Sequence, residues 1–293
     1  VMLESVVDFI DTYVIVDTGS SDSTKQVIKD FFDDRGIEGE IHDRPWYNDF
    51  GRSRTEAIKL ARGKSDYLLF MDATDRFVGK PGSLEVDQYR VAFLSHSNKY
   101  YRPVIVKNDD KFNWRYEGVL HEYLTTDSSK YSMKILEDCH IIYNVVKGGR
   151  DDNPNKYLDD AMILEEELKK DPTNDRYQFY LAQSYRDAKM FKQAIRAYQR
   201  RVEMGGWHEE VYESLYNIGI CMLILGEDSE KIEEHFSNVH KEYPHRVESL
   251  YQLARYFRFK KDYKRSYEYG IQGIEIPYPK NDRLFVNRTV YEY

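Results

Sequence analysis

The 293-residue sequence predicts an α/β domain over residues 1–150, followed by an all-α repeat domain over residues 151–293. Up to about residue 146, short β-branched segments alternate with amphipathic ones, which is typical of a sheet flanked by helices. A stretch rich in Gly, Asp and Pro at residues 147–154 marks a domain boundary. Beyond it, small residues recur at spacings of 37 and 35 residues, which indicates repeated pairs of helices.

Composition and charge restrict the class of protein. Hydrophobic residues make up 41% of the chain and charged residues 32%, as expected for globular domains with their own cores. The apolar runs are too short to span a membrane. The net charge of −8 argues against general nucleic-acid binding, which needs a basic face. Two cysteines, Cys139 and Cys221, are too few for a disulfide framework, so we expect a reducing, cytoplasmic location.

The chain begins with a helical pattern over residues 2–10 and then a strand over residues 13–16. No strand precedes this helix, so we expect the first strand of the sheet to lie outside this sequence. The strand ends at Asp17, and Gly19 allows a tight turn before the next helix. A strand that ends in Asp before a Gly-Ser turn suits a nucleotide phosphate, although an ordinary capped turn is an open alternative. The helix runs to about residue 32, and its expected inward residues are Val27, Ile28, Phe31 and Phe32.

A short strand over residues 38–42 precedes an aromatic and polar loop and a helix over residues 52–61. Arg52 and Arg54 fall in the first turn of this helix, where cations oppose the helix dipole. A nearby diphosphate would offset that cost. Plain surface charge is the alternative interpretation.

The segment Tyr67-Leu-Leu-Phe-Met-Asp-Ala-Thr-Asp75 is an apolar run that ends in two carboxylates. It predicts a strand buried on both faces in the middle of a parallel sheet. Asp72 and Asp75 would lie at the carboxyl end of that strand, where open α/β sheets bind ligands. Two such carboxylates can hold a divalent cation on a phosphate-bearing substrate. Turn and helix-cap roles for both residues are the alternative.

Further strands are predicted over residues 88–95, 100–107 and 139–146. Between the last two lies the segment Trp114-Arg-Tyr-Glu-Gly-Val-Leu-His-Glu-Tyr123. It places two carboxylates, a histidine and aromatic rings within ten residues. This density makes it the second candidate site segment of the chain.

Three motifs together resemble a known family. The segment Asp17-Thr-Gly-Ser-Ser-Asp-Ser-Thr24, after an apolar strand, resembles the signature of family 2 glycosyltransferases of the GT-A fold. The pattern Trp46-x-x-Asp49-Phe…Arg54 and the segment Met71-Asp-Ala-Thr-Asp75 follow at the distances expected for that family. The sequence departs from the family at Thr74, where a second aspartate usually stands, and threonine is a neutral ligand. The resemblance covers about residues 1–150 and implies a nucleoside-diphosphate-sugar donor, with a UDP-sugar favoured.

The resemblance also implies an inverting transfer of the sugar to a hydroxyl acceptor, which is a glycan or a protein. A Gly-x-x-His-Glu segment ends at Glu122, which the resemblance makes the general base, with Glu117 in reserve. A carboxylate is needed because the acceptor hydroxyl loses its proton as it attacks the anomeric carbon. The resemblance assigns Mn²⁺ or Mg²⁺ to Asp72, Asp75 and His121, and donor binding to Asp17, Gly19, Asp49, Arg54 and Asp72.

The carboxyl-terminal half shows internal repetition. Ala182, Gly219 and Ala254 occupy equivalent positions, and Ala194 and Ser266 lie twelve residues after the first and the last of them. Small residues at these positions let two helices of a hairpin approach closely. A period near 34 with this pattern is the tetratricopeptide signature.

Two interpretations of the repeats are open: a groove that binds a partner or presents the acceptor, and a structural extension. The charged stretches at residues 196–201 and 255–261 are expected to be solvated. A rival function is a repeat-based interaction protein with a decayed, inactive transferase domain, as Thr74 and the missing strand suggest. A nucleotidyltransferase is a third interpretation, although no Gly-rich phosphate loop is seen in the sequence.

Overall fold

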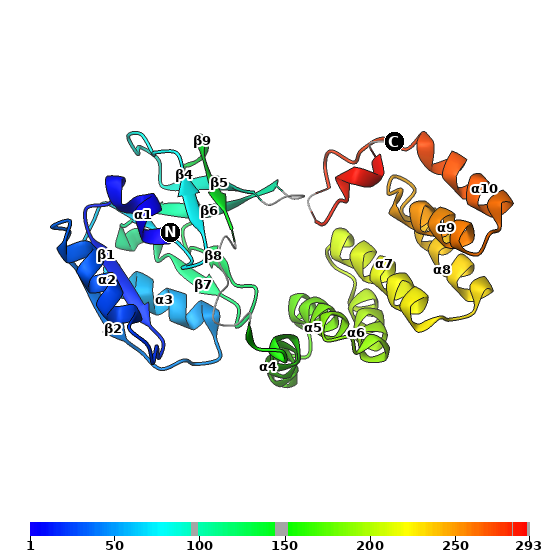
Figure 1. Ribbon diagram of the computed structural model, residues 1–293, viewed down its shortest axis with the longest axis horizontal. Coiled ribbons are helices and arrows are strands. Elements are labelled where there is room, and N and C mark those ends of the chain that lie inside the picture. Colours follow the sequence, from blue (N-terminus) through cyan, green and yellow to red (C-terminus); the bar gives the residue numbers. More distant parts are fainter. Residues whose placement is uncertain (95–98, 144–151, 283, 292–293) are drawn as a thin grey trace. The chain divides into compact units, whose positions relative to one another are not determined.

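The computed structural model describes residues 1–94, 99–143, 152–282 and 284–291 (Figure 1). The chain divides into two compact units, Val1–Pro154 and Asn155–Tyr293. The domain boundary predicted at residue 150 lies outside the described residues. The first unit is α/β and the second is all-α, so the predicted fold class is confirmed.

The first unit opens with a small parallel sheet. Its strands pair from Tyr13↔Gly39 to Asp17↔Asp43. Helix α2 packs on this sheet through Phe32, which is 1% exposed and stacks on the Tyr13 ring at 3.9 Å between centroids. The prediction for Val27 is wrong, because its side chain is 58% exposed. A two-stranded sheet covers only a narrow stripe of the helix. The elements of this part are α1 (Met2–Val6), β1 (Tyr13–Asp17), α2 (Thr24–Asp33) and β2 (Gly39–Asp43).

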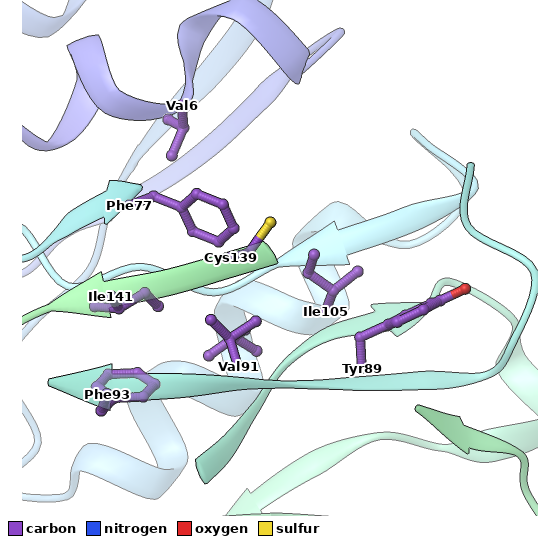
Figure 2. Close-up of a cluster of buried hydrophobic side chains, with 9 residues drawn as sticks. Val6, Phe77, Tyr89, Val91, Phe93, Ile105, Cys139 and Ile141 are labelled. Carbon is purple, nitrogen blue, oxygen red and sulfur yellow. The ribbon is translucent and has the colours of Figure 1, made fainter. Parts of the chain in front are cut away.

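A five-stranded sheet forms the main core of the first unit. Its strand order is β3-β6-β5-β9-β4, in which β5 and β9 are parallel and the other pairs antiparallel. Figure 2 shows the cluster on this sheet, where Val6 of α1 joins Phe77, Val91 and Ile141. The strands are β3 (Tyr67–Leu69), β4 (Arg76–Val78), β5 (Gln88–Leu94), β6 (Lys99–Lys107) and β9 (Met133–Ile142). The last predicted strand thus begins earlier than expected, and its residues 144–146 lie outside the described residues.

The prediction of a central parallel strand over the segment Tyr67–Asp75 is wrong. Strand β3 has three residues, lies at the edge of its sheet and pairs antiparallel to β6. Only Leu68 of the strand is buried. A cavity of about 810 Å³, lined largely by apolar residues, touches both β3 and β1. Within the described residues no third strand joins them, so β3 is left at an edge.

Helix α3 (Phe50–Ala61) lies against the hairpin of β7 (Arg115–Glu117) and β8 (Tyr123–Thr125). Its Ile58 is buried in a second core cluster with Leu68, Trp114 and Tyr116. This packing ties the second candidate segment of the sequence to the helix that carries Arg54. The fold therefore brings residues about 60 positions apart in the chain into one region.

The second unit is a succession of packed helices, each lying against the next. Ala182 and Ala194, both 0% exposed, lie where α5 meets α6, as predicted. At Gly219, an added Cβ would come within 2.5 Å of the Phe236 ring, so α7 and α8 also need a small residue. The helices are α4 (Lys156–Lys170), α5 (Asp175–Asp187), α6 (Phe191–Met204), α7 (His208–Leu225), α8 (Ser229–Glu242), α9 (Glu248–Phe259) and α10 (Tyr263–Ile274). None of the helices in the described ranges is long and apolar enough to cross a membrane.

The expectation that the charged stretches are solvated is wrong for Arg201, which is 0% exposed. Its Nη2 lies 2.9 Å from Oε2 of Glu210 and 3.4 Å from Oδ2 of Asp175. A buried guanidinium needs such partners, because an unpaired buried charge is strongly destabilising.

A larger polar cluster surrounds Arg246, which is 1% exposed and lies 4.0 Å from the centroid of the Tyr212 ring. Its guanidinium bonds Oε1 of Glu248 at 2.9 Å and Oε1 of Glu213 at 3.2 Å. It also approaches Oδ2 of Asp282 at 3.3 Å. Three carboxylates thus face one cation. Burial raises the pKa of Glu213 to about 8, against the attraction of Arg246 and with a contribution from Glu248.

We expect the contribution of Glu213 to the stability of the second unit to fall as the pH rises from about 4.5 to about 8. Glu213 keeps its proton over this range in the fold and loses it in the unfolded chain, so unfolding releases a proton. Release of one proton lowers the free energy of unfolding by up to about 1.4 kcal/mol per pH unit. Urea unfolding of wild type, Glu213→Gln and Glu234→Gln across this range checks it. Glu234 is exposed on α8, so only Glu213→Gln should flatten the slope. Equal slopes in all three proteins would contradict the assignment.

Candidate functional site

The turn after β1 is built around the carboxylate of Asp17, which is 7% exposed. Its Oδ2 accepts hydrogen bonds from the backbone N–H groups of Gly19 at 3.1 Å and Ser20 at 2.9 Å. Gly19 has φ +119°, a conformation that favours glycine. Burial alone would raise the pKa of Asp17, but the bonds from Ser20 and Gly19 and the charge of Lys25 lower it. The carboxylate is therefore ionised and held in place by its own turn.

Arg54 joins the two candidate segments of the sequence. Its Nε donates to Oε1 of Glu122 at 2.6 Å, and its Nη2 forms a short bond to Oδ1 of Asp72. Its guanidinium also lies 5.4 Å from the centroid of the Tyr116 ring. Burial would lower the pKa of Arg54, but Asp72, Tyr116 and Glu122 together raise it. Arg54 is therefore a permanent cation between two carboxylates that are 50 residues apart in the chain.

Backbone contacts hold the loop that carries Glu122 against α3. The hydroxyl of Thr55 donates to the carbonyl of Tyr116 at 3.0 Å and accepts from its N–H at 2.9 Å. The N–H of Gly51 donates to the carbonyl of Gly118 at 3.1 Å. These residues position the acid and were not predicted from the sequence. Gly51, two residues after Asp49, was the only sign in the sequence of a close approach at this point.

Gly51→Ala is expected to destabilise the first unit by about 1–3 kcal/mol, the usual cost of overpacking. An added Cβ would lie 2.6 Å from the carbonyl oxygen of Gly118, so the loop has to move away from α3. Thermal and urea unfolding measure the change. Gly82→Ala is the matched control, because its Cβ would meet nothing within 4 Å. If the two variants unfold alike, the close approach at Gly51 is not what holds the loop.

Asp49 caps α3, since its Oδ1 accepts from the N–H of Arg52 at 2.8 Å. Such a cap satisfies an otherwise unpaired backbone donor. The structure therefore gives Asp49 a local role beside the donor-binding role that the resemblance implies.

Asp72 and Asp75, the two carboxylates of the segment Tyr67–Asp75, lie in different surroundings. The N–H of Asp75 donates to the carbonyl of Asp72 at 3.0 Å, which closes a turn. Asp75 is 4% exposed and accepts a bond from the hydroxyl of Thr74 at 3.3 Å. The side chain of Asp72 is 39% exposed and paired with Arg54. Thr74 thus supports Asp75 instead of offering a third carboxylate.

His121 is exposed and has φ +52°. Its ring does not meet Asp72 and Asp75 in a common ligand cluster. Within the described ranges, one group of three or more His, Cys, Asp or Glu residues brings its ligand atoms within 4.8 Å of one another. That group is His208, Glu209 and Asp282, in the helical unit.

Glu117 lies in a different setting from Glu122. Its Oε1 accepts from Nη2 of Arg115 at 2.7 Å, and its Oε2 accepts from the hydroxyl of Tyr123 at 2.9 Å. Of the two predicted bases, Glu122 is the one that Arg54 brings to the acidic segment. Its side chain is 10% exposed, against 42% for Glu117.

Comparisons with solved structures concern the helical repeats. The chain is similar to a MamA RS-1 double mutant at 10% identity and a TM-score of 0.36, over 42% of this chain and 66% of that one. It therefore spans just under two thirds of that protein. A crystal structure of MamA matches at 16% identity and a TM-score of 0.34, over 45% of this chain and 76% of that one. YrrB, described as a TPR protein with an unusual peptide-binding site, matches at 14% identity and a TM-score of 0.23, over 42% and 78%.

Comparisons by sequence concern the first unit. No curated protein sequence matches the chain significantly. A family model, Glycosyl transferase family 2, matches residues 2–79. The match includes Asp17, Asp49, Arg54, Asp72 and Asp75, and it ends before Glu117, His121 and Glu122. Residues 2–79 of this chain are therefore similar to family 2 glycosyl transferases.

Proposed function

We propose that the first unit is an inverting glycosyltransferase, which moves a sugar from a nucleoside-diphosphate sugar, with UDP-sugars favoured, to a hydroxyl acceptor. One observation carries the proposal: Arg54 links Asp72, inside the segment that matches family 2, to Glu122, which lies outside it. The similarity and the resemblance supply the class of reaction. The contact between the two segments supports a single site for that reaction.

Glu122 takes the proton in this mechanism. Arg54 occupies Oε1 of Glu122, and Oε2 receives the proton of the acceptor hydroxyl. The acceptor oxygen forms its bond to the anomeric carbon as the bond from that carbon to the diphosphate oxygen breaks. The electron pair of the broken bond leaves on the diphosphate. A single displacement of this kind inverts the configuration at the anomeric carbon.

Arg54 supplies positive charge in the same region. Its pKa is raised by the surrounding acids, so it stays charged throughout the cycle. A guanidinium has five N–H donors, and the bonds to Glu122 and Asp72 use two of them. The remaining donors can offset the charge that develops on the diphosphate as it leaves. Asp17 and Gly19, at the carboxyl end of β1, are the proposed contacts for the nucleoside part.

The predicted cation site does not fit the arrangement of its residues as a set. Asp72 is paired with Arg54, Asp75 is buried beside Thr74, and His121 is not clustered with them. The proposed mechanism therefore uses only side chains of this chain. Dependence on Mn²⁺ or Mg²⁺ stays a prediction from the resemblance. Donor binding measured after EDTA treatment and again after adding MnCl₂ or MgCl₂ tests it.

The proposal is tested with the full chain and a panel of common sugar nucleotides. Release of the nucleoside diphosphate reports hydrolysis of the donor, which needs no knowledge of the acceptor. We expect one donor to be hydrolysed and the corresponding nucleoside diphosphate to bind. No turnover and no binding with any donor at millimolar concentration would refute the proposal.

The second candidate is an interaction protein with an inactive transferase unit. It is favoured by Thr74, which stands where the family usually has an acid. The pairing of Asp72 with Arg54 also favours it, because that pairing occupies a carboxylate predicted to bind the cation. Calorimetry with UDP and MnCl₂ separates the two functions. Heat of binding favours the enzyme, and its absence favours the interaction protein. That the repeats present a glycan or protein acceptor stays a prediction.

A further inference from the structure

The end of the described chain folds back onto the helical unit. This tail, defined as residues 278–282 and 284–291, follows α10 and reaches the N-terminal ends of α7 and α9 (Figure 1, red). The N–H of Leu284 donates to Oε2 of Glu209, near the start of α7, at 2.6 Å. The hydroxyl of Tyr291 donates to Oε2 of Glu248, at the start of α9, at 2.8 Å. The tail thus bridges two alternate helices of the unit, α7 and α9.

Two side chains of the tail act as anchors. Oδ2 of Asp282 lies 3.3 Å from Nη1 of Arg246 and 3.3 Å from Nε2 of His245. The Tyr291 oxygen also accepts from the N–H of Val247 at 3.2 Å. The first anchor is the carboxylate of Asp282, which contacts the two basic side chains of Arg246 and His245. The second is a hydroxyl between a donor and an acceptor.

The two sides of this contact differ in burial. The receiving residues Arg246, Glu248 and Glu209 are 1%, 3% and 5% exposed. As whole residues, the described part of the tail is half-buried or exposed, with Phe285 58% exposed, whereas the side chain of the anchor Asp282 is 10% exposed. The anchors of the tail are therefore polar, and none of its described apolar residues is fully buried. Segments of this kind open at a lower free-energy cost than the packed helices beneath them.

The receiving surface holds its shape by its own bonds. Two of the partners of Arg246, Glu213 and Glu248, belong to the helices and not to the tail. Oε2 of Glu248 also accepts from the hydroxyl of Tyr212 at 3.1 Å. A surface that is organised before binding loses less entropy when a ligand arrives. The tail therefore covers a preformed site.

We propose that the tail is an internal ligand of a peptide-binding site, formed by Glu209, His245, Arg246 and Glu248. When the tail leaves, the site takes a segment of a partner protein that carries a carboxylate and, nine residues later, a tyrosine hydroxyl. This spacing is that of Asp282 and Tyr291. Because the tail competes with the partner, the apparent affinity falls with the fraction of molecules in which the site is open.

The test uses the full chain and a fluorescent peptide with the sequence of residues 277–291. Fluorescence anisotropy compares wild type with the double variant Asp282→Asn and Tyr291→Phe, whose own tail lacks both anchors. We expect the variant to bind the peptide at least about tenfold more tightly than wild type. Lys280→Ala, a change at an exposed tail position, should bind like wild type. A peptide with the same two substitutions should bind to none of them.

Equal binding to wild type and the double variant, or binding to neither, would overturn the proposal. Hydrogen exchange of the wild-type chain keeps the test decisive if the variant does not fold. The N–H groups of Leu284 and Val247 should exchange faster than those inside α7 and α9. Exchange of all of them only with global unfolding would make the tail an integral part of the fold and would also overturn the proposal.

Discussion

Glu122→Gln is expected to lower donor turnover by about 10²- to 10⁴-fold, the usual contribution of a general base. The amide keeps the shape of the side chain and still accepts a bond from Arg54, but it cannot take the acceptor proton. Arg54 also keeps Asp72 as a partner, so the site should hold together. Initial rates of nucleoside-diphosphate release from the preferred sugar nucleotide measure the loss.

Glu117→Gln is the matched control for this prediction, since Glu117 ends β7, the strand that leads into the loop of Glu122, but bonds Arg115 and Tyr123 instead of Arg54. Its turnover should stay within a few-fold of wild type. Equal losses in the two variants would show that the loop matters and not the base. A loss confined to Glu117→Gln would identify Glu117, and not Glu122, as the general base.

Arg246→Met is expected to lower the free energy of unfolding by about 3–5 kcal/mol. The substitution leaves the carboxylate of Glu248, whose side chain is 4% exposed, buried with no cation beside it. Methionine roughly fills the space of the arginine stem, so the loss reports charge more than volume. Urea denaturation followed by circular dichroism measures it.

Arg200→Met provides the comparison for Arg246→Met. Arg200 is 57% exposed and pairs with Glu203 at the surface of α6, where ion pairs contribute little. Its substitution should change stability by no more than about 0.5 kcal/mol. If Arg246→Met also falls within that range, the cluster around Arg246 does not stabilise the unit.

Features that depend on nearby residues could be predicted from the sequence. The spacing of Ala182, Ala194 and Gly219 predicted where helices approach closely, because a helical hairpin is a local structure. The Asp17 turn was likewise predictable, since Gly19 and the start of the next helix follow directly. The strands over residues 88–95 and 100–107 were predicted for the same reason.

Features that depend on distant partners could not be predicted in the same way. The segment Tyr67–Asp75 is apolar enough for a central strand, but its place in the sheet is set by which strands pair with it. The burial of Arg201 and Arg246 depends on acids that the fold brings in from other helices. The contact between Arg54 and Glu122 spans 68 residues, and the resemblance to a family was the only sign of it.

The free edges of β1 and β3 have a consequence for self-association. Within the described residues, each strand pairs on one side only, and one cavity touches both strands. Residues Tyr13–Val16 form a largely β-branched run without a charged residue or a proline. Charged residues and prolines are what usually prevent edge-to-edge pairing of strands. Such a segment is a template for strands of other molecules. Aggregation of this chain should therefore begin at β1 and rise steeply with protein concentration.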